Sequence, residues 1–261
     1  LAHDIAQRLL ARSQGSARYT ASLVTQGANV TLQADSDLMG LSLDGLPPLR
    51  KTAAEAWPLR IEKTARGDQH SLRVSAGRVF GLHLERHQEG GTLRLQRGVF
   101  AVNEPANTPE SGMLVLLTMP RLDVNAWSSW LGLGLPGEAP PRGAAADGVR
   151  IDHLALRTPE LAFAQRVFRN VTLGATRTAV GGFDVNVVSE GATGYIGWRP
   201  PPTGATGAAS LGHISARLSR LVISESRTDE VVDVLKAPRR QFPSVEATVE
   251  HFEIGGNQLG R

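Results

Sequence analysis

The chain has 261 residues, of which 41% are hydrophobic and 20% charged, a composition typical of a globular protein rather than a disordered one. Its 28 basic and 25 acidic residues give a net charge of only +3, and the arginines are spread along the chain, which argues against a nucleic-acid-binding surface. The absence of cysteine excludes disulfides, cysteine–zinc sites and thiol nucleophiles.

Three short helices are predicted along the chain. Residues 4–12 place apolar side chains at helical spacing before Gly15, which acts as a stop signal. Residues 123–131 carry two tryptophans on one side, after a polar capping residue. Residues 228–236 begin with acids and end with Lys236 before Pro238, as the helix dipole favours.

Most of the remaining chain alternates apolar and polar residues, with the period of two that is typical of a half-buried strand. Glycine pairs such as Gly90–Gly91 and Gly181–Gly182 punctuate these runs. Successive strands follow one another after about 10–15 residues, too few for helical crossovers, so we expect sequential antiparallel pairing. The sequence therefore predicts a mainly β fold: a long antiparallel meander with a few short helices.

Two proline- and glycine-rich segments interrupt the alternation. Residues 138–148 form a Pro/Gly/Ala-rich loop, and residues 200–209 form another segment that cannot supply strand hydrogen bonds at its prolines. Strands resume in the same style after the first loop. We therefore expect residues 1–137 and 149–261 to be two parts of one continuous unit.

Two motifs suggest chemistry but lack its structural context. Residues 132–137 match the dinucleotide pattern G-x-G-x-x-G, yet a predicted helix precedes them and a proline-rich loop follows, instead of a strand and a helix. His83 and His87, with Glu85 between them, would have Cα atoms about 13 Å apart on a strand, too far to share a metal. We interpret them as solvent-side residues of a strand.

No nucleophile motif of the form G-x-S-x-G occurs, and Asp35 and Asp37 have no further oxygen ligand near them in sequence. We therefore predict no enzyme activity, no catalytic residue, no metal site and no cofactor. No apolar run is long enough to cross a bilayer, and the chain begins with Leu1 rather than Met. We expect it to be a fragment cut at both ends.

Three segments together resemble the YhdP family. Residues 35–59 are similar to a family passage in which a strand reading S-D-L-x-G-L is followed by a leucine–proline loop, a lysine and an A-x-P-L return. Gly194, Ile196 and Trp198 match a G-x-I-x-W strand, which residues 216–221 follow with A-R-L-x-R-L, and residues 242–260 resemble the family's ending. The matching positions of the first segment are Ser36, Asp37, Leu38, Gly40, Leu41, Leu46, Pro47, Lys51, Pro58 and Leu59.

The resemblance implies an AsmA-like bacterial envelope protein that is anchored in the inner membrane and extends across the periplasm. It implies that the meander curls into an elongated β-groove, as in AsmA and TamB, through which phospholipids pass toward the outer membrane. This chain is then expected to be an interior, periplasmic stretch of the groove. The membrane contact and any partner proteins of the envelope would belong to parts outside it.

An antiparallel sheet with one apolar face must cover that face, and acyl chains can do so where helices are too few. The leading hypothesis is therefore a non-catalytic conduit that shelters phospholipid tails in an apolar β-groove. The alternative is a structural or assembly factor that docks partner proteins through its sheet edges; an enzyme acting on envelope glycans has no supporting motif. The candidate groove-lining residues are Leu82, Leu84, Leu93, Leu95, Leu154, Leu156, Leu161, Phe163, Phe183, Val185 and Val187.

Overall fold

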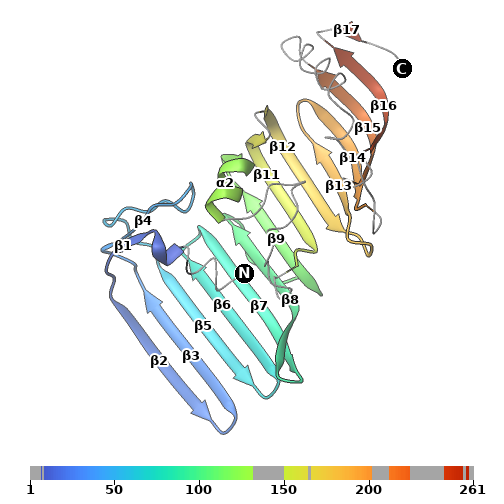
Figure 1. The fold of residues 1–261 in the computed structure, drawn as a ribbon. Coiled ribbons are helices and arrows are strands. Elements are labelled where there is room, and N and C mark those ends of the chain that lie inside the picture. The colour runs from blue at the N-terminus through green and yellow to red at the C-terminus, as the bar shows by residue number, and fades with distance from the viewer. Residues whose placement is uncertain are drawn as a thin grey trace. The chain divides into compact units, whose positions relative to one another are not determined.

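The computed structural model describes residues 7, 9–131, 150–163, 166–201, 212–223, 244–254 and 257–258. The chain divides into two compact units. The N-terminal unit comprises Leu1–Met119 and Val124–His153, and the C-terminal unit comprises Pro120–Asp123 and Leu154–Arg261. Strands dominate both units (Figure 1), so the prediction of a mainly β fold is confirmed.

The N-terminal unit contains an open sheet in which the strands follow the order β2-β3-β5-β6-β7-β8-β9, together with a separate pair formed by β1 and β4. From β2 to β8 every pairing is antiparallel. The strand bounds are β1 Ser13–Gly15, β2 Tyr19–Gln26, β3 Asn29–Ser36, β4 Leu41–Leu43, β5 Leu59–Arg66, β6 Gln69–Ala76, β7 Phe80–Glu89, β8 Thr92–Val102 and β9 Gly112–Thr118.

Tight hairpins fix the register of this sheet. Gln26 pairs with Asn29, Arg66 with Gln69, and Glu89 with Thr92, which leaves two-residue turns between the strands. Short hairpins join strands that are adjacent in sequence and keep the alternation of each strand in phase with its neighbour. Where β7 pairs with β8, a bulge between Glu85 and Arg86 inserts one extra residue into β8.

The antiparallel order breaks at β9, which runs parallel to β8, with Val99 opposite Leu114. Residues 103–111, here called the crossover loop, therefore return along the length of β8 before β9 begins. The sequence did not predict this parallel pairing, because a connection of nine residues contains no helix that would signal a crossover.

The C-terminal unit repeats the same plan. Its strands follow the order β11-β12-β13-β14-β15-β16-β17, and β10 adds to β11 in parallel. The pairings from β12 to β15 are antiparallel, and β16 is parallel to β15. The bounds are β10 Arg121–Asp123, β11 His153–Phe163, β12 Arg166–Arg177, β13 Phe183–Val188, β14 Ala192–Arg199, β15 His213–Ile223, β16 Ser244–Ile254 and β17 Asn257–Gln258.

The helix predicted at residues 123–131 is confirmed except for its first residue: α2 spans Val124–Leu131, and the rings of Trp127 and Trp130 meet edge to face with their centroids 5.5 Å apart. Of the helix predicted at residues 4–12, the described residues 7 and 9–11 are helical, and residue 12 is in a turn. The helix predicted at 228–236, the loop at 138–148 and the dinucleotide-like residues 132–137 lie outside the described residues, as does most of the loop at 200–209.

Candidate functional site

The sheet of the N-terminal unit has one apolar and one polar face. Its pairing registers carry the alternation of each strand across to the next, so that most of the apolar side chains from β2 to β9 share one side. This side, the first apolar face, is formed by Ala21, Leu23, Val30, Leu32, Ala34, Leu59, Ile61, Ala65, Leu72, Val74, Ala76, Phe80, Leu82, Leu84, Leu93, Leu95, Phe100, Val102, Met113, Val115 and Leu117.

Burial changes steadily across the first apolar face. At β7 and β8 it is a packed core, in which Leu84 is 1% exposed and Val102 2%. At β2 and β3 large side chains meet solvent: Leu23 is 64% exposed and Leu32 37%. Because single exposed leucines are common but a row of them beside a core is not, this open end is the feature that calls for a ligand or partner.

The sheet of the C-terminal unit is divided in the same way. The second apolar face consists of Leu173, Ala175, Phe183, Val185, Val187, Ile196, Trp198, Ile214, Ala216, Leu218, Val245, Ala247 and Val249. Leu218 is 8% exposed, whereas Val245 on β16 is 63% exposed. The rings of Phe183 and Trp198 are stacked with centroids 6.4 Å apart. The apolar face is again buried in the middle and open toward one edge.

Four of the residues that the sequence singled out as groove-lining come together on the first apolar face. Leu82 and Leu84 alternate on β7, and Leu93 and Leu95 lie on β8 opposite Gln88 and Arg86. The bulge brings the two leucine pairs to one side, since its extra residue shifts the alternation of β8 by one position. Leu84 is core, Leu82 and Leu95 are half-buried, and Leu93 is 44% exposed.

The remaining candidates lie in the C-terminal unit. Phe183, Val185 and Val187 share the second apolar face and are all half-buried. Leu154 and Leu156 lie on β11 together with Leu161 and Phe163. The two pairs are an odd number of residues apart, so regular alternation directs them to opposite sides of that strand. Leu156 is buried, and the other three are half-buried.

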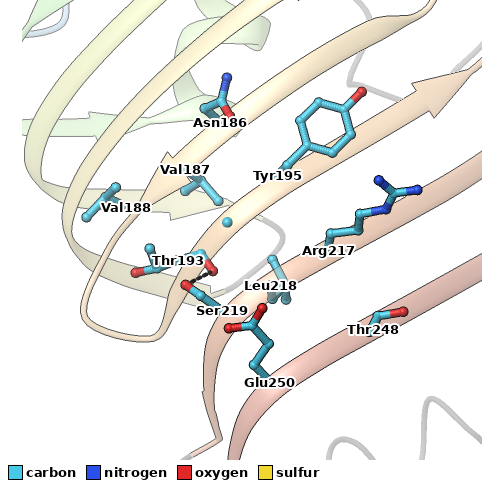
Figure 2. A pocket seen from close by; sticks show the side chains of 11 residues that line it. Asn186, Val187, Val188, Thr193, Tyr195, Arg217, Leu218, Ser219, Thr248 and Glu250 are labelled. Atoms are coloured by element: carbon cyan, nitrogen blue, oxygen red, sulfur yellow. Dashed lines mark hydrogen bonds between the residues drawn. The ribbon is translucent and has the colours of Figure 1, made fainter.

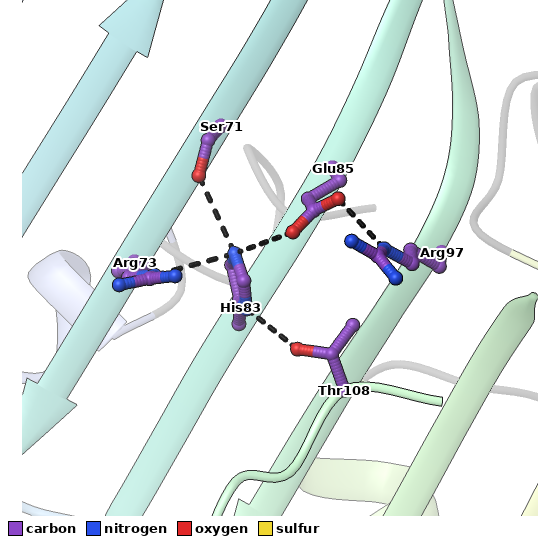
Figure 3. Close-up of polar contacts among 6 residues, drawn as sticks. All are labelled: Ser71, Arg73, His83, Glu85, Arg97 and Thr108. Atoms are coloured by element: carbon purple, nitrogen blue, oxygen red, sulfur yellow. Dashed lines mark hydrogen bonds and ion pairs between the residues drawn. The ribbon is translucent and has the colours of Figure 1, made fainter. Parts of the chain in front are cut away.

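The polar face of the N-terminal sheet contains a network centred on His83 (Figure 3). The Nε of Arg73 donates to Nε2 of His83 at 3.3 Å, so Nδ1–H is the donor to Oγ1 of Thr108, 2.6 Å away. Thr108 belongs to the crossover loop. Nearby, the Arg97 guanidinium donates to the Glu85 carboxylate at 2.7 Å.

His83 was expected on the solvent side of its strand, and that prediction is wrong with respect to burial: its exposed fraction is 8%. The crossover loop covers it, as shown by the Thr108 contact and by Ala106, whose Cβ would lie 2.9 Å from a Cβ added at Gly81. Val99 and Ala101, opposite His83 and Gly81 on β8, are fully buried. The loop thus closes the polar face at this point.

Burial lowers the pKa of His83, and the positive charge of Arg73 lowers it further. The hydrogen bond from Arg97 lowers the pKa of Glu85. In the C-terminal unit the hydrogen bond from the Tyr195 hydroxyl, 2.6 Å long, lowers the pKa of Asp184, with a second contribution from Arg199. These networks neutralise the polar faces internally, and nothing in their geometry resembles a nucleophile beside a base.

Two recesses are bordered mainly by residues of the polar faces. One, of about 540 Å³, is bordered by the cross-strand row Asn186, Tyr195, Arg217 and Thr248 (Figure 2). Its floor includes Gly194, where a Cβ would lie 2.3 Å from the Arg217 carbonyl oxygen, which explains why this strand requires glycine. The other, of about 770 Å³, lies beside Thr20, Asp35, Arg60 and Ser75.

The family-like segment at residues 35–59 is a loop organised by a buried lysine, a feature that the sequence alone did not reveal. Lys51 is 3% exposed, and its Nζ donates to the carbonyl oxygens of Leu38, Leu41 and Thr52 at 2.8, 2.7 and 3.0 Å. At Gly40, where φ is +87°, a Cβ would lie 2.5 Å from the Ser16 carbonyl oxygen. The lysine and the glycine of the pattern therefore have structural roles.

Among the described residues, no group of three or more histidine, aspartate and glutamate side chains is arranged to hold a metal ion. Asp35 instead pairs with Arg60 at 3.6 Å, and Asp37 accepts a hydrogen bond from the Met39 amide. None of the described helices has the length and apolarity needed to cross a membrane.

Comparison with known proteins agrees with the family-like segments. The model of the YhdP protein family matches residues 1–261. The intermembrane phospholipid transporter YhdP of Escherichia coli strain K12 is 29% identical over 159 residues, which are 59% of this chain and 12% of that protein. The chain thus spans a small part of the length of this relative. No solved structure matches the chain.

Proposed function

This chain belongs to the YhdP family, and from that premise we propose that its two apolar faces shelter the acyl chains of phospholipids during their transfer between the inner and outer membranes. The observation that carries the proposal is the open end of the first apolar face, where Leu23 and Leu32 are exposed beside a packed core. The matched relative is named as a phospholipid transporter. No catalytic step is part of the proposal.

The physical chemistry of the faces supports such a role. A methylene group fully removed from water contributes about 0.8 kcal/mol, so a sixteen-carbon tail that buries about half its surface on an open face gains on the order of 6 kcal/mol. That gain depends on apolar area and needs no specific hydrogen bond. A tail can therefore be held by many positions of the face in turn, as a conduit requires.

We place this chain in the periplasm, as one stretch of a longer protein whose other parts contact the membranes. The lack of cysteine suits that compartment without being specific to it. In this role the polar faces, with their internal ion pairs, face water.

Native mass spectrometry of the purified protein tests the proposal directly. We expect phospholipid to co-purify with the chain and to be removed by organic extraction. A photo-crosslinking amino acid at Val185, on the second apolar face, is expected to form lipid adducts in cells, whereas the same probe at its exposed neighbour Asn186, on the polar face, serves as the matched control. A lipid-free protein with no adducts at Val185 would refute it.

A second candidate function is the docking of envelope proteins through a sheet edge. The outermost strand of the N-terminal sheet, β2, has all eight residues exposed and pairs on one side with β3. Unpaired strand edges accept further strands from other segments. Protein rather than lipid adducts at Val185, or a protein partner crosslinked through β2, would favour this function over lipid transport.

A further inference from the structure

Charged residues are sorted between the two faces of the N-terminal sheet. The acids of strands β2 to β9 are Asp35, Glu62, Glu85 and Glu89, and the registers place all four on the polar face. The apolar face contains two residues with a permanent charge, Lys63 on β5 and Arg86 on β7, and both are basic. His70, on the strand between them, is on the same side.

Three basic residues of the polar face have acidic partners, whereas the two basic residues of the apolar face have none among the described residues. Arg60 pairs with Asp35, Arg97 with Glu85 and Arg94 with Glu89, with N–O distances between 2.7 and 3.6 Å. Within the part of the chain that the structure describes, no carboxylate lies within ion-pair distance of Lys63 or Arg86. Lys63 is exposed and Arg86 half-buried, so both remain accessible.

The registers place these residues around a common point. His70 pairs across the ladder with Arg86, and Leu72 pairs with Lys63. Lys63 and Arg86 are two strands and two residues apart, which corresponds to about 12 Å between their Cα atoms. Two long basic side chains can approach one group from both ends of such a span. His70 lies between them and contacts Gln88, with 3.2 Å between Nε2 and Oε1.

An unpaired cation beside leucines attracts an anion more strongly than one in open water, because the apolar surroundings lower the local dielectric. The arginine fork and the lysine ammonium are the groups that bind phosphate oxygens in proteins. A phospholipid combines a phosphate with two apolar tails. A face with exposed leucines and two basic side chains without acidic partners is complementary to both parts of that molecule.

The second apolar face follows the same rule. In its registered rows the charged residue is Arg177, whose guanidinium lies 4.6 Å from the centre of the Phe183 ring. The charged residues of the rows on the opposite face include Asp184, Arg199, Arg217, Arg220 and Glu246. In the rows up to Val249, the two acids, Asp184 and Glu246, both lie opposite the second apolar face.

We propose that Lys63 and Arg86, with His70 between them, bind the phosphate of a phospholipid whose tails lie on the first apolar face. The three residues are called the basic patch. This inference rests on the proposed function, since it assigns the headgroup position of the same ligand. The basic patch selects for lipids that carry a phosphate and gives the ligand a defined orientation on the face.

The test compares the binding of phosphatidylglycerol with that of diacylglycerol of identical acyl chains, each measured by native mass spectrometry on the purified chain. In the wild-type protein we expect phosphatidylglycerol to bind more tightly. In the double variant K63Q/R86Q its affinity should fall about tenfold, with diacylglycerol binding unchanged. The charge-preserving variant K63R/R86K should retain wild-type binding.

The matched control is R60Q/R94Q, which removes the same number of charges from β5 and β8 on the polar face and should leave both affinities unchanged. Urea unfolding of each variant checks that the sheet is intact. Equal losses in the patch and control variants, or equal binding of the two lipids by the wild type, would overturn the inference and leave the proposed function standing. Binding of neither lipid by the wild type would refute both.

Discussion

The two faces of the N-terminal sheet differ in how the rest of the chain covers them. Over the polar face the chain folds back on itself, since the crossover loop buries His83 and is held there by Thr108. Over the apolar face, Leu23 and Leu32 remain exposed at β2 and β3. A sheet normally closes its apolar side first, because that side gains most from burial.

This difference follows from which face the connecting segments of the chain cover. A parallel return between β8 and β9 needs a loop that passes over one face, and this loop passes over the polar one. Acids are likewise confined to that face, where arginines pair with them. At β2 and β3 the apolar face is thereby left exposed and free of negative charge, as a surface for phospholipid requires.

The largest expected effect separates the core of the apolar face from its open end. Leu84→Ala removes a side chain that is 1% exposed and should lower the free energy of unfolding by about 3 kcal/mol. Leu23→Ala, at 64% exposure, should change it by less than about 0.5 kcal/mol yet reduce the amount of bound lipid. Urea unfolding and native mass spectrometry measure the two quantities. Similar stability losses in both variants would mean that the face has no open end.

A second experiment compares neighbours on β3 that point to opposite faces. Leu32→Asp introduces an acid into the apolar face and should weaken phospholipid binding about tenfold, or roughly 1.4 kcal/mol. Thr31→Asp places the same acid on the polar face and should leave the affinity within a factor of two of the wild type. If both aspartates weaken binding equally, the lipid does not distinguish the faces.

The sorting of side chains between faces could be predicted from the sequence, because alternation with a period of two is a local property. Phe183, Val185 and Val187 share a face for this reason. The same rule fails where one residue is inserted: Leu95 is an odd number of positions from Phe100, and the two share a face because a bulge lies between them. A bulge depends on the partner strand and leaves little trace in a single strand's pattern.

Contacts between distant segments account for what the sequence could not show. The burial of His83 depends on Thr108, 25 residues later, whose return over β7 follows from the parallel pairing of β9. The cage around the Lys51 ammonium consists of backbone carbonyls, which any sequence possesses. The basic patch was likewise missed, because Lys63, His70 and Arg86 become neighbours through the register of three strands.

Loosening the crossover loop should lower the free energy of unfolding without changing the amount of bound phospholipid. Thr108→Val keeps the shape of the side chain but removes the acceptor for Nδ1–H of His83, so we expect a loss of about 1 kcal/mol. Limited proteolysis should cleave the crossover loop faster in this variant, and phospholipid loading should equal that of the wild type. A fall in loading would show that the two faces are coupled and do not have separate roles.

The smallest expected effect is the pH dependence that His83 confers on the same loop. The pKa of His83 is lowered in the folded chain, first by burial and then by the nearby charge of Arg73. Arg97 on β8 lowers it as well, while the carboxylates of Glu85 and of Glu62 on β5 act in the opposite direction. The unfolded chain therefore takes up the proton at a higher pH than the folded one, near the ordinary histidine value of about 6.5.

Because the unfolded state binds the proton first, the stabilising contribution of neutral His83 is complete above about pH 6.5 and is lost as the pH falls toward the lowered pKa of the folded state. Urea midpoints measured between pH 7.5 and pH 5.5 should decline in the wild type and stay flatter in His83→Gln, which cannot titrate. Glu85, whose pKa is also lowered, loses its contribution only in the acidic range where carboxylates titrate, so it does not overlap this window. An identical decline in the two proteins would show that His83 does not respond to pH through the crossover loop, and the closure of the polar face would then rest on packing at Gly81 and Val99 alone.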